Sequence, residues 1–258
     1  QKNKTKLGHK KFMTILTAGC SFTKYKWACW PNFVKWFEPQ DDIINLGNSA
    51  SSNETIGRTV YNAVSKYKNI KKVYVMWSGP NRYEVVSDTQ GDKTMEGATW
   101  STYDPDWKWF QYYGGHVNKD KHNYYQKYFL NEKQNEIRLL EKILFTQLLL
   151  DKHKIEYKMM CYMSNILSHD TEKMSNGHRA LYKQINWNSF IFYKDKLGLY
   201  EFAKLEYPKE FAEDSDQHPL PLVHYKWVKD IMYQSNIEPP KDELDKLLNF
   251  KDNLSTTG

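Results

Sequence analysis

Four short polar segments of this sequence carry residue types that together can perform nucleophilic catalysis. Ser21 lies in the segment TAGCSFTKY, directly after an apolar run. A serine becomes a nucleophile when a base accepts its proton, a carboxylate orients that base, and hydrogen-bond donors stabilise the oxyanion. The backbone N–H of Gly47 and the side-chain amide of Asn81 are candidate donors. Candidates for the carboxylate and the base precede the last predicted helix: Asp214, Asp216, His218 and His224.

These segments follow apolar runs that are typical of buried strands. The predicted strands cover residues 12–18, 41–48, 71–79 and 155–164. Helical patterns separate them, and this alternation predicts an α/β fold: a three-layer α/β/α sandwich around a central parallel sheet of about five strands. Since chemistry in such sheets sits beyond the carboxyl ends of the strands, we expect the turns that contain Ser21, Gly47 and Asn81 to converge.

The helical patterns differ in clarity. Residues 21–37 are predicted to be helical, with Pro31 interrupting the helix or starting a second one. In the next helix Ile56, Val60, Ala63, Val64 and Tyr67 share one face, and Ser52 or Asn53 is the expected cap. A long helix over 130–152 carries the stripe Ile137, Leu140, Leu144 and Leu148, and a final helix is predicted over 222–234. Residues 1–258 are expected to form one domain, with an insertion at about 80–128 and a loosely packed polar tail from about 238.

The four segments resemble the conserved blocks of the SGNH family, also called GDSL-type hydrolases, whose sheet is flavodoxin-like. AGCSFT resembles the block whose serine is the nucleophile and whose backbone N–H helps to hold the oxyanion, which implies both roles for Ser21, and NLGNSASSN implies an oxyanion donor at Gly47. SGPNR implies a third donor at Asn81, and SDQHP implies Asp216 as the orienting acid and His218 as the base. The resemblance extends over about 210 residues but only through these blocks, in the order that the family shows.

The sequence departs from the family pattern at three places. Cys20 stands where the family has an aspartate, and Arg82 stands where an aspartate usually follows the asparagine, which would change the preferred charge of the substrate. One residue separates Asp216 from His218 instead of two, so Asp214 is the reserve for the orienting acid. A Ser–His pair with weak support from an acid is a further alternative.

Each candidate also has a purely structural interpretation. Ser21 would serve as a helix cap, Asn81 as a turn residue beside Pro80, and Gly47 as a residue with positive φ. His218 would be a surface histidine, whereas packing is the favoured interpretation of His224. Cys20 as the nucleophile is disfavoured, because adjacent residues on a tight turn point in different directions.

The remaining histidines and aromatic residues give weaker signals. His116, His122, His169 and His178 lack metal-ligand spacing and are predicted to be surface or loop residues, so no metal site is expected. The insertion carries an aromatic cluster, interpreted as packing or, second, as a lid or stacking wall: Trp100, Tyr103, Trp107, Trp109, Phe110, Tyr112 and Tyr113. No nucleotide-binding, dinucleotide-binding or HExxH motif occurs, and no cofactor is expected.

Composition limits the partners and the compartment. The net charge is +6, but lysines are scattered through all segments, which favours a solvated surface over a nucleic-acid interface. The odd number of cysteines, three without a CxxC pair, fits a reducing compartment. Since no apolar run approaches 18 residues and no signal peptide is recognised, no membrane partner is expected and a cytoplasmic or virion-associated location is predicted. The Lys-, Asn- and Tyr-rich composition is compatible with a phage or bacterial source.

The sequence therefore predicts a serine esterase that forms a covalent acyl-enzyme. The family resemblance and the aromatic insertion favour a small-molecule or carbohydrate ester, such as an O-acetylated carbohydrate, as the substrate. Two alternatives stay open: an acyltransferase with the same fold, and a binding or structural protein that has lost catalysis. The oligomeric state is not predicted.

Overall fold

A computed structural model describes residues 13–80, 82–87, 99–100, 108–112, 131–213 and 216–249. Its central sheet is parallel throughout, in the order β2-β1-β3-β7. The strands are β1 (Thr14–Ala18), β2 (Asp42–Asn45), β3 (Ile70–Trp77) and β7 (Glu156–Cys161). Beside β7, Phe190 makes a single parallel bridge to Met159 in place of the fifth strand that the sequence suggested. The predicted α/β class with a parallel sheet is confirmed.

Strand residues alternate between two hydrophobic cores, as the two-residue period of a strand requires. In β3, Val73, Val75 and Trp77 face one core. Tyr74 and Met76 face the other. All five are at most 3% exposed, so the sheet is buried on both faces. This double burial explains why the strands read as continuous apolar runs in the sequence.

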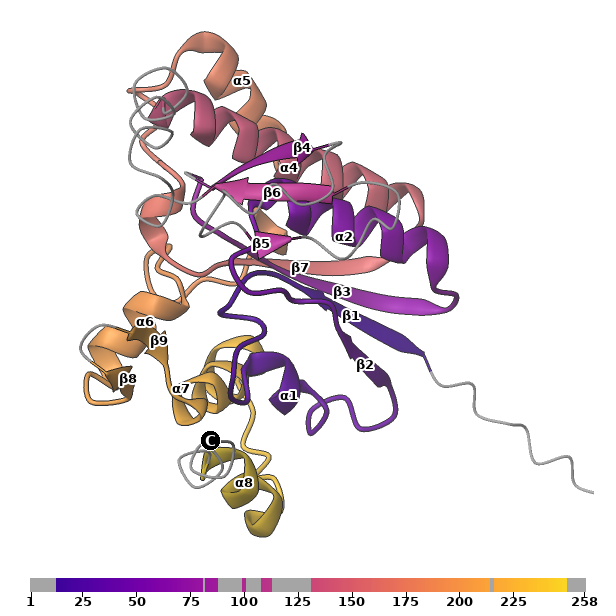
Figure 1. Ribbon diagram of the computed structural model, residues 1–258, viewed down its shortest axis with the longest axis vertical. Helices are drawn as coiled ribbons and strands as arrows, with labels where there is room; N and C mark the ends of the chain where they lie inside the picture. Colours follow the sequence, from indigo (N-terminus) through magenta and orange to yellow (C-terminus); the bar gives the residue numbers. More distant parts are fainter. Residues whose placement is uncertain are drawn as a thin grey trace, which may run out of the picture.

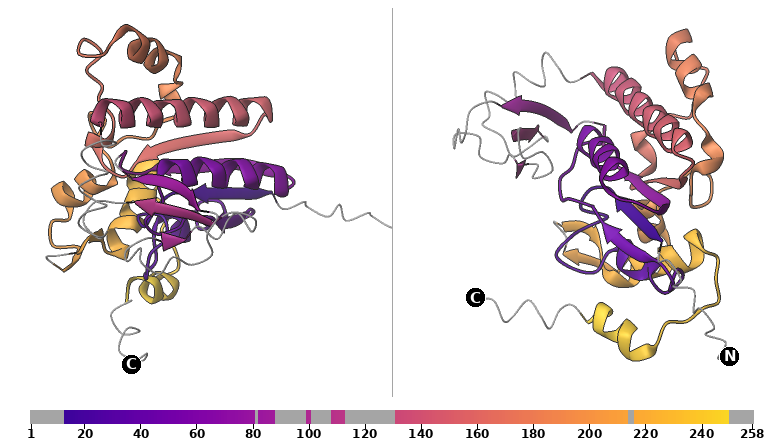
Figure 2. Two further views of the ribbon diagram at one scale, coloured as in Figure 1. Left: turned by 45° about the horizontal axis from the view of Figure 1, so that its top comes forward. Right: turned by 90° about the vertical axis from the view of Figure 1, so that its right-hand side faces the viewer.

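Helices cover both faces and complete three layers (Figures 1 and 2). The first core packs under α2 (Asn53–Lys66) and α4 (Glu132–Lys152). The second packs against α1 (Trp30–Val34), α7 (Pro221–Lys226) and the π-helical η3 (Trp227–Met232). Within the part of the chain that the structure describes, no helix has the length and apolarity that crossing a membrane requires.

The two long helices test the predicted faces. In α2, Ile56, Val60 and Ala63 are buried as predicted, and the Ser52 side chain accepts from the Thr55 N–H as the N-cap. In α4, the prediction of a stripe through Leu148 was wrong, since Leu148 is 57% exposed.

The buried face of α4 passes through two polar residues instead. Thr146 donates to the Lys142 carbonyl, and the amide of Gln147 donates to Ser189 Oγ. Because these side chains find partners inside the protein, the helix can bury them, and apolar spacing alone pointed to the wrong face.

The segment after β1 differs from the predicted helix. Residues 21–29 form turns, and the helix begins only at Trp30, with Pro31 in its first turn. Proline suits that position because the first N–H groups of a helix lack intrahelical partners. Because residues 21–29 are not helical, this segment can cross the carboxyl end of the sheet, where the predicted site lies.

The predicted insertion contains a separate antiparallel sheet of order β4-β6-β5. Its strands are β4 (Tyr83–Ser87), β5 (Thr99–Trp100) and β6 (Lys108–Tyr112). Three residues of the aromatic cluster, Trp109, Phe110 and Tyr112, lie in β6. The side chains of these strand residues lie outside the described part, and so do Tyr103, Trp107 and Tyr113 as a whole. Both interpretations of the cluster therefore stay predictions.

The remaining elements follow β7 and lead to the C-terminus (Figure 1). They are η1 (Ser164–Ile166), α5 (Asn176–Gln184), η2 (Trp187–Ser189), α6 (Leu199–Glu206), β8 (Phe211–Glu213), β9 (Asp216–Pro219) and α8 (Lys241–Leu248). Helix α8 lies within the expected polar tail, and its Leu244 and Leu247 pack against the second core.

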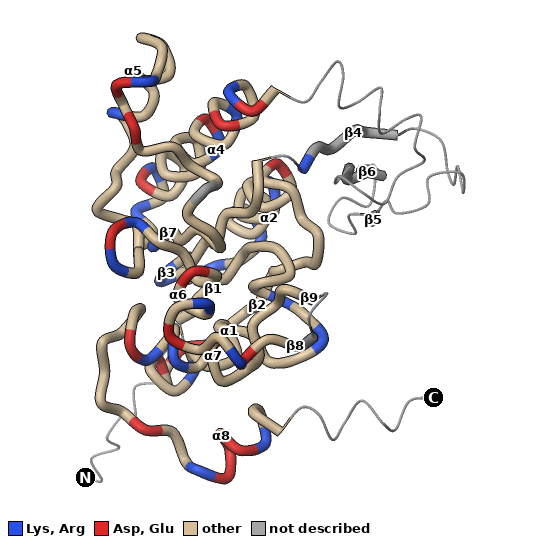
Figure 3. Tube along the Cα trace, turned by 90° about the vertical axis from the view of Figure 1, so that its left-hand side faces the viewer, with Lys and Arg blue, Asp and Glu red and all other residues tan. Residues whose placement is uncertain are grey.

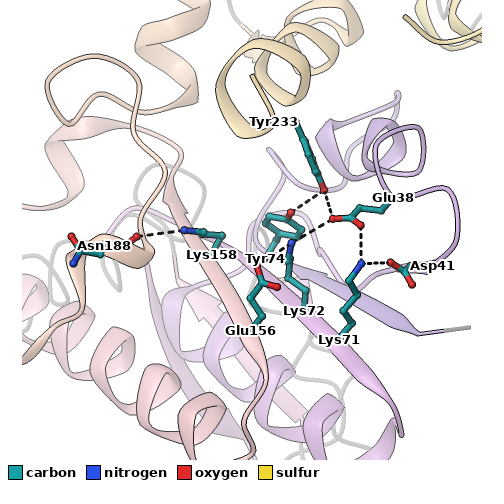
Figure 4. A network of polar contacts seen from close by, with 9 residues as sticks. All are labelled: Glu38, Asp41, Lys71, Lys72, Tyr74, Glu156, Lys158, Asn188 and Tyr233. Carbon is teal, nitrogen blue, oxygen red and sulfur yellow. Dashed lines mark hydrogen bonds and ion pairs between the residues drawn. The ribbon is translucent and has the colours of Figure 1, made fainter. Parts of the chain in front are cut away.

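A polar network joins the amino end of β3 to the α1–β2 connection and to the segment after η3 (Figure 4). Lys71 Nζ lies 2.6 Å from Asp41 Oδ2 and 2.9 Å from Glu38 Oε2, and Lys72 also contacts Glu38. The hydrogen bond to Asp41, then that to Glu38, raises the pKa of Lys71. Tyr233 donates to Glu38. Elsewhere acidic and basic residues are interspersed along the described trace (Figure 3). The network marks the edge of the sheet away from the predicted site.

Candidate active site

The turns after β1, β2 and β3 lie at one edge of the sheet and are joined by hydrogen bonds. The Asn48 N–H of the second turn donates to the Gly19 carbonyl of the first at 3.0 Å. The Ser49 hydroxyl donates to the Lys24 carbonyl, also at 3.0 Å. Ser21, Gly47 and the residues after Trp77 therefore share one edge, as the parallel order β2-β1-β3 requires.

The first turn is built around a glycine and a threonine. The N–H groups of Thr23 and Lys24 both donate to the Cys20 carbonyl, which folds the chain tightly around Ser21. A Cβ atom at Gly19 would lie 2.1 Å from Thr23 Oγ1 and 3.0 Å from the Met76 carbonyl oxygen. Glycine therefore fits this position best, because it lets the turn close against Thr23 and β3. Ser21 in this turn is 5% exposed.

Ser21 meets His218 across this edge. Ser21 Oγ lies 2.7 Å from His218 Nε2, although 197 residues separate them in the sequence. His218 lies in β9, which pairs with β8 as a short antiparallel ribbon just before α7. The indole N–H of Trp27 donates to the Pro219 carbonyl at 3.0 Å and fastens β9 to the segment that follows Ser21. The 2.7 Å between Ser21 Oγ and His218 Nε2 suits proton transfer from the hydroxyl to the imidazole.

Two aromatic rings lie against the imidazole of His218. The Tyr25 ring is stacked on it, with centroids 4.2 Å apart and planes inclined by 11°. The Phe22 ring lies 5.1 Å away with its plane tilted by 41°. Both rings come from the turns around Ser21, so Ser21 and the two rings that flank His218 belong to one segment.

The second turn depends on Asn45, the last residue of β2. Its amide Nδ2 donates to the Thr23 carbonyl at 3.0 Å, and its Oδ1 accepts from Thr17 Oγ1 at 3.2 Å and from the Gly47 N–H at 2.9 Å. A Cβ at Gly47 would lie 2.8 Å from Thr23 Cγ2, so packing also favours glycine there. The Gly47 N–H, which is the predicted oxyanion donor of this turn, therefore already donates to Asn45 Oδ1.

The third turn is held by Asn53, in the first turn of α2. Its side chain accepts from the Ser78 N–H at 2.8 Å and donates to the Ser78 carbonyl at 3.0 Å, so it pairs with the Ser78 backbone through two hydrogen bonds. Arg82 Nη1 donates to the Ser51 carbonyl at 3.0 Å, so its guanidinium reaches back over the second turn. Asn81 lies outside the described residues, and its role stays a prediction.

Asp216, the predicted orienting acid, is the first residue of β9, but its side chain lies outside the described part of the structure, as does the whole of its reserve, Asp214. The orienting role of either residue stays a prediction. His224 is 1% exposed on α7, and its Nδ1 has no hydrogen-bond partner. Burial above all, and then the neighbouring His218, lower the pKa of His224 to about 3, so this histidine is neutral.

Sequence reasoning missed Asn45 and the site role of Asn53. Asn53 was considered only as a helix cap, and a polar residue at the buried end of a strand was the available signal for Asn45. The surface prediction for His178 was wrong: it is 7% exposed on α5, beside Glu136.

His169 is half-buried in a loop, with its Nδ1 2.6 Å from the Tyr182 hydroxyl. Burial lowers the pKa of His169 to about 4. His116 and His122 lie outside the described residues. Within the described ranges, no three His, Cys, Asp or Glu side chains gather as metal ligands.

The three cysteines are all buried, which argues against a cysteine nucleophile. Cys20 is fully buried in the second core, and Cys29 and Cys161 are also buried with free thiols. Burial raises the pKa of the Cys29 thiol to about 12, so this thiol stays protonated. Reactive cysteines carry a lowered pKa and are accessible, and Cys29 has neither property.

Among solved structures, this chain is similar to a member of the lipolytic protein G-D-S-L family from Veillonella parvula, with a TM-score of 0.42 and 10% identity over 86% of this chain and 99% of that one. It is also similar to a serine-to-alanine mutant of the esterase AlinE4, with a TM-score of 0.39 and 11% identity over 95% of each chain. A search of curated protein sequences gives no significant match. One family matches residues 17–191, which is more than half of the sequence, and the chain therefore belongs to the family of unknown function DUF6071.

Proposed function

We propose that this protein is a serine hydrolase that cleaves ester bonds, with Ser21 as the nucleophile and His218 as the general base. The observation that carries the proposal is the 2.7 Å contact between Ser21 Oγ and His218 Nε2. A serine that served only as a cap would bond to a backbone N–H of the following helix. Here the helix begins nine residues later, at Trp30, and the hydroxyl meets an imidazole instead.

The contact defines the proton movements. Ser21 Oγ attacks the ester carbonyl carbon while His218 Nε2 accepts the hydroxyl proton, which forms a tetrahedral oxyanion. The intermediate collapses, the bond to the alcohol breaks, and His218 returns the proton to the leaving oxygen. Water then attacks the acyl-enzyme with His218 again as the base, which releases the carboxylic acid and restores Ser21.

The oxyanion would be held by the Ser21 N–H, the Gly47 N–H and the Asn81 amide. Gly47 can take part only by exchanging its bond to Asn45 Oδ1 for one to the substrate, or by sharing the N–H between the two. Losing one donor of this kind costs about 10²–10³-fold in kcat. Asn81→Ala should reduce turnover by that factor and leave the fold intact.

The preferred substrate is an ester of a carbohydrate, with an acetyl group as the acyl part. Support comes from the aromatic composition of residues 100–113, which suits stacking against sugar rings, and from the sequence blocks of the site. Arg82 extends over the second turn and adds positive charge near the site, which favours neutral or anionic esters over cationic ones. Asp216, with Asp214 in reserve, is proposed to orient His218.

The test compares hydrolysis of p-nitrophenyl acetate and butyrate by the parent protein, Ser21→Ala and Ser65→Ala. Ser65 is an exposed serine on α2 and controls for the substitution itself. We expect Ser21→Ala to lose at least about 10³-fold in kcat and Ser65→Ala to match the parent, with circular dichroism unchanged. Equal rates for all three proteins would refute the role of Ser21, and release of acyl product only when an alcohol acceptor is added would indicate an acyltransferase.

A further inference from the structure

The imidazole of His218 has an aromatic support that the proposed mechanism has not used. Tyr25 lies parallel to it at a centroid distance of 4.2 Å, well within the roughly 6 Å over which a cation and an aromatic face attract each other. When Ser21 transfers its proton, His218 becomes an imidazolium. The negative face of the Tyr25 ring then lies directly against the new positive charge.

We propose that Tyr25 is a positioning residue for the reaction: its ring holds the imidazole of His218 toward Ser21 and stabilises the imidazolium form by a cation–π contact. This inference rests on the proposed function, because the charged form matters only if His218 accepts the proton of Ser21. Stacking acts more strongly on the charged imidazole than on the neutral one, so it favours the intermediate over the resting state.

The surroundings of Tyr25 keep its ring in place. The Trp27 ring meets it edge-on, with centroids 4.6 Å apart and planes at 76°. Trp27 is in turn fixed to the strand of His218 by its hydrogen bond to the Pro219 carbonyl. Tyr25 is therefore linked to His218 in two ways. It stacks directly on the imidazole, and it contacts Trp27, which is hydrogen-bonded to the backbone of β9.

Other groups around His218 also influence its charge, and the test has to separate them from Tyr25. The Lys26 ammonium lies 5.4 Å from the Tyr25 ring centroid and opposes a positive charge on the histidine. Among the described residues, further titratable groups on the elements around His218 are the neutral His224 of α7, Tyr200 of α6, which donates to Gln217, and Tyr162, whose ring lies beside that of Phe22. Asp216 precedes His218 in β9. Substitutions at Tyr25 leave all of these in place.

The experiment measures two properties in the parent, Tyr25→Phe, Tyr25→Leu and Tyr25→Met. One is the pH dependence of kcat and KM for p-nitrophenyl acetate. The other is an NMR titration of the His218 ring, assigned by its loss in His218→Asn. Phe37→Leu is the matched control: Phe37 stacks on Tyr233 with centroids 4.9 Å apart and belongs to the opposite edge of the sheet.

We expect Tyr25→Leu and Tyr25→Met to lower the titration midpoint of His218 by about half a pH unit and to reduce kcat roughly three- to tenfold with little change in KM. Tyr25→Phe should restore both, since the ring carries the effect, and Phe37→Leu should change neither. Titration midpoints that match the parent in Tyr25→Leu and Tyr25→Met would overturn the inference, as would a Tyr25→Phe protein that behaves like Tyr25→Leu. Because the titration needs no turnover, it decides this point even if Ser21→Ala shows that the proposed function is wrong.

Discussion

Asn53 offers the sharpest test of how the site is assembled. Its side chain bridges to the Ser78 N–H at 2.8 Å and to the Ser78 carbonyl at 3.0 Å. Ser78 is 0% exposed and Asn53 is 4% exposed, so water does not replace these bonds in the folded protein. Asn53→Ala would leave a buried N–H and a buried carbonyl of the third turn without partners.

The expected cost follows from these two groups. A buried polar group left without a partner costs about 1–3 kcal/mol, so the pair should lower the free energy of unfolding by about 2–6 kcal/mol. For a chain of this size, each 1 kcal/mol shifts Tm by about 2–4 °C, which gives a fall of roughly 4–24 °C. Asn53→Asp has almost the same shape but places a second acceptor against the Ser78 carbonyl, and it should cost at least as much.

The assay is thermal and urea unfolding followed by circular dichroism, with Asn62→Ala as the control on the exposed face of the same helix. The ester hydrolysis rate of Asn53→Ala, measured below its Tm, should also fall, because the turn that leads to Asn81 is no longer anchored. If Asn53→Ala unfolds like Asn62→Ala, or if Asn53→Asp is as stable as the parent, the hydrogen bonds to Ser78 do not hold the third turn and this reasoning fails.

Three further predictions concern stability and are checked by the same unfolding measurements. Gly19→Ala should destabilise by about 2 kcal/mol or more, because its Cβ would lie 2.1 Å from a threonine hydroxyl, whereas Gly177→Ala, with nothing within 4 Å, should be neutral or slightly stabilising. Leu140→Ala should cost about 2–5 kcal/mol and Leu148→Ala almost nothing, since they are 0% and 57% exposed. The unfolded chain binds the proton that buried His224 excludes, so stability should fall as pH drops from about 6.5 toward about 3, by roughly 2 kcal/mol at pH 5, and His224→Leu should flatten that dependence.

Much of the sheet could be predicted from the sequence because its strands are buried on both faces. Residues such as Val73, Val75 and Met76 form uninterrupted apolar runs, and the turns after them carry the small polar residues of the site. The shared edge follows from the parallel alternation, because the carboxyl ends of parallel strands meet at the same edge. The order β2-β1-β3-β7 was not predicted, since alternation alone is compatible with several strand orders. The Ser21–His218 contact was foreseeable only through the resemblance to a family, because 197 residues separate the two.

The features that were not predicted depend on contacts between residues that lie far apart in the sequence, and no local pattern reveals such contacts. Gln147 is buried in α4 because Ser189 accepts its amide proton, and a hydropathy stripe cannot register such a match. The helix predicted after Ser21 fails because tertiary bonds, such as that from Asn45 to Thr23, outweigh local helix propensity. No pattern in the sequence indicated the proposed role of Tyr25, because that role depends on stacking against His218, which is distant in the sequence.

The distance along the chain between Ser21 and His218 also affects how the protein is made. A ribosome adds roughly 5–20 residues per second, so His218, which lies 197 positions after Ser21, is added about 10–40 s later. Throughout that interval the nascent polypeptide has its serine turn but lacks His218, the proposed base. Under the proposed mechanism, fragments that end before β9 are therefore expected to be inert toward the esters of the cell that makes them.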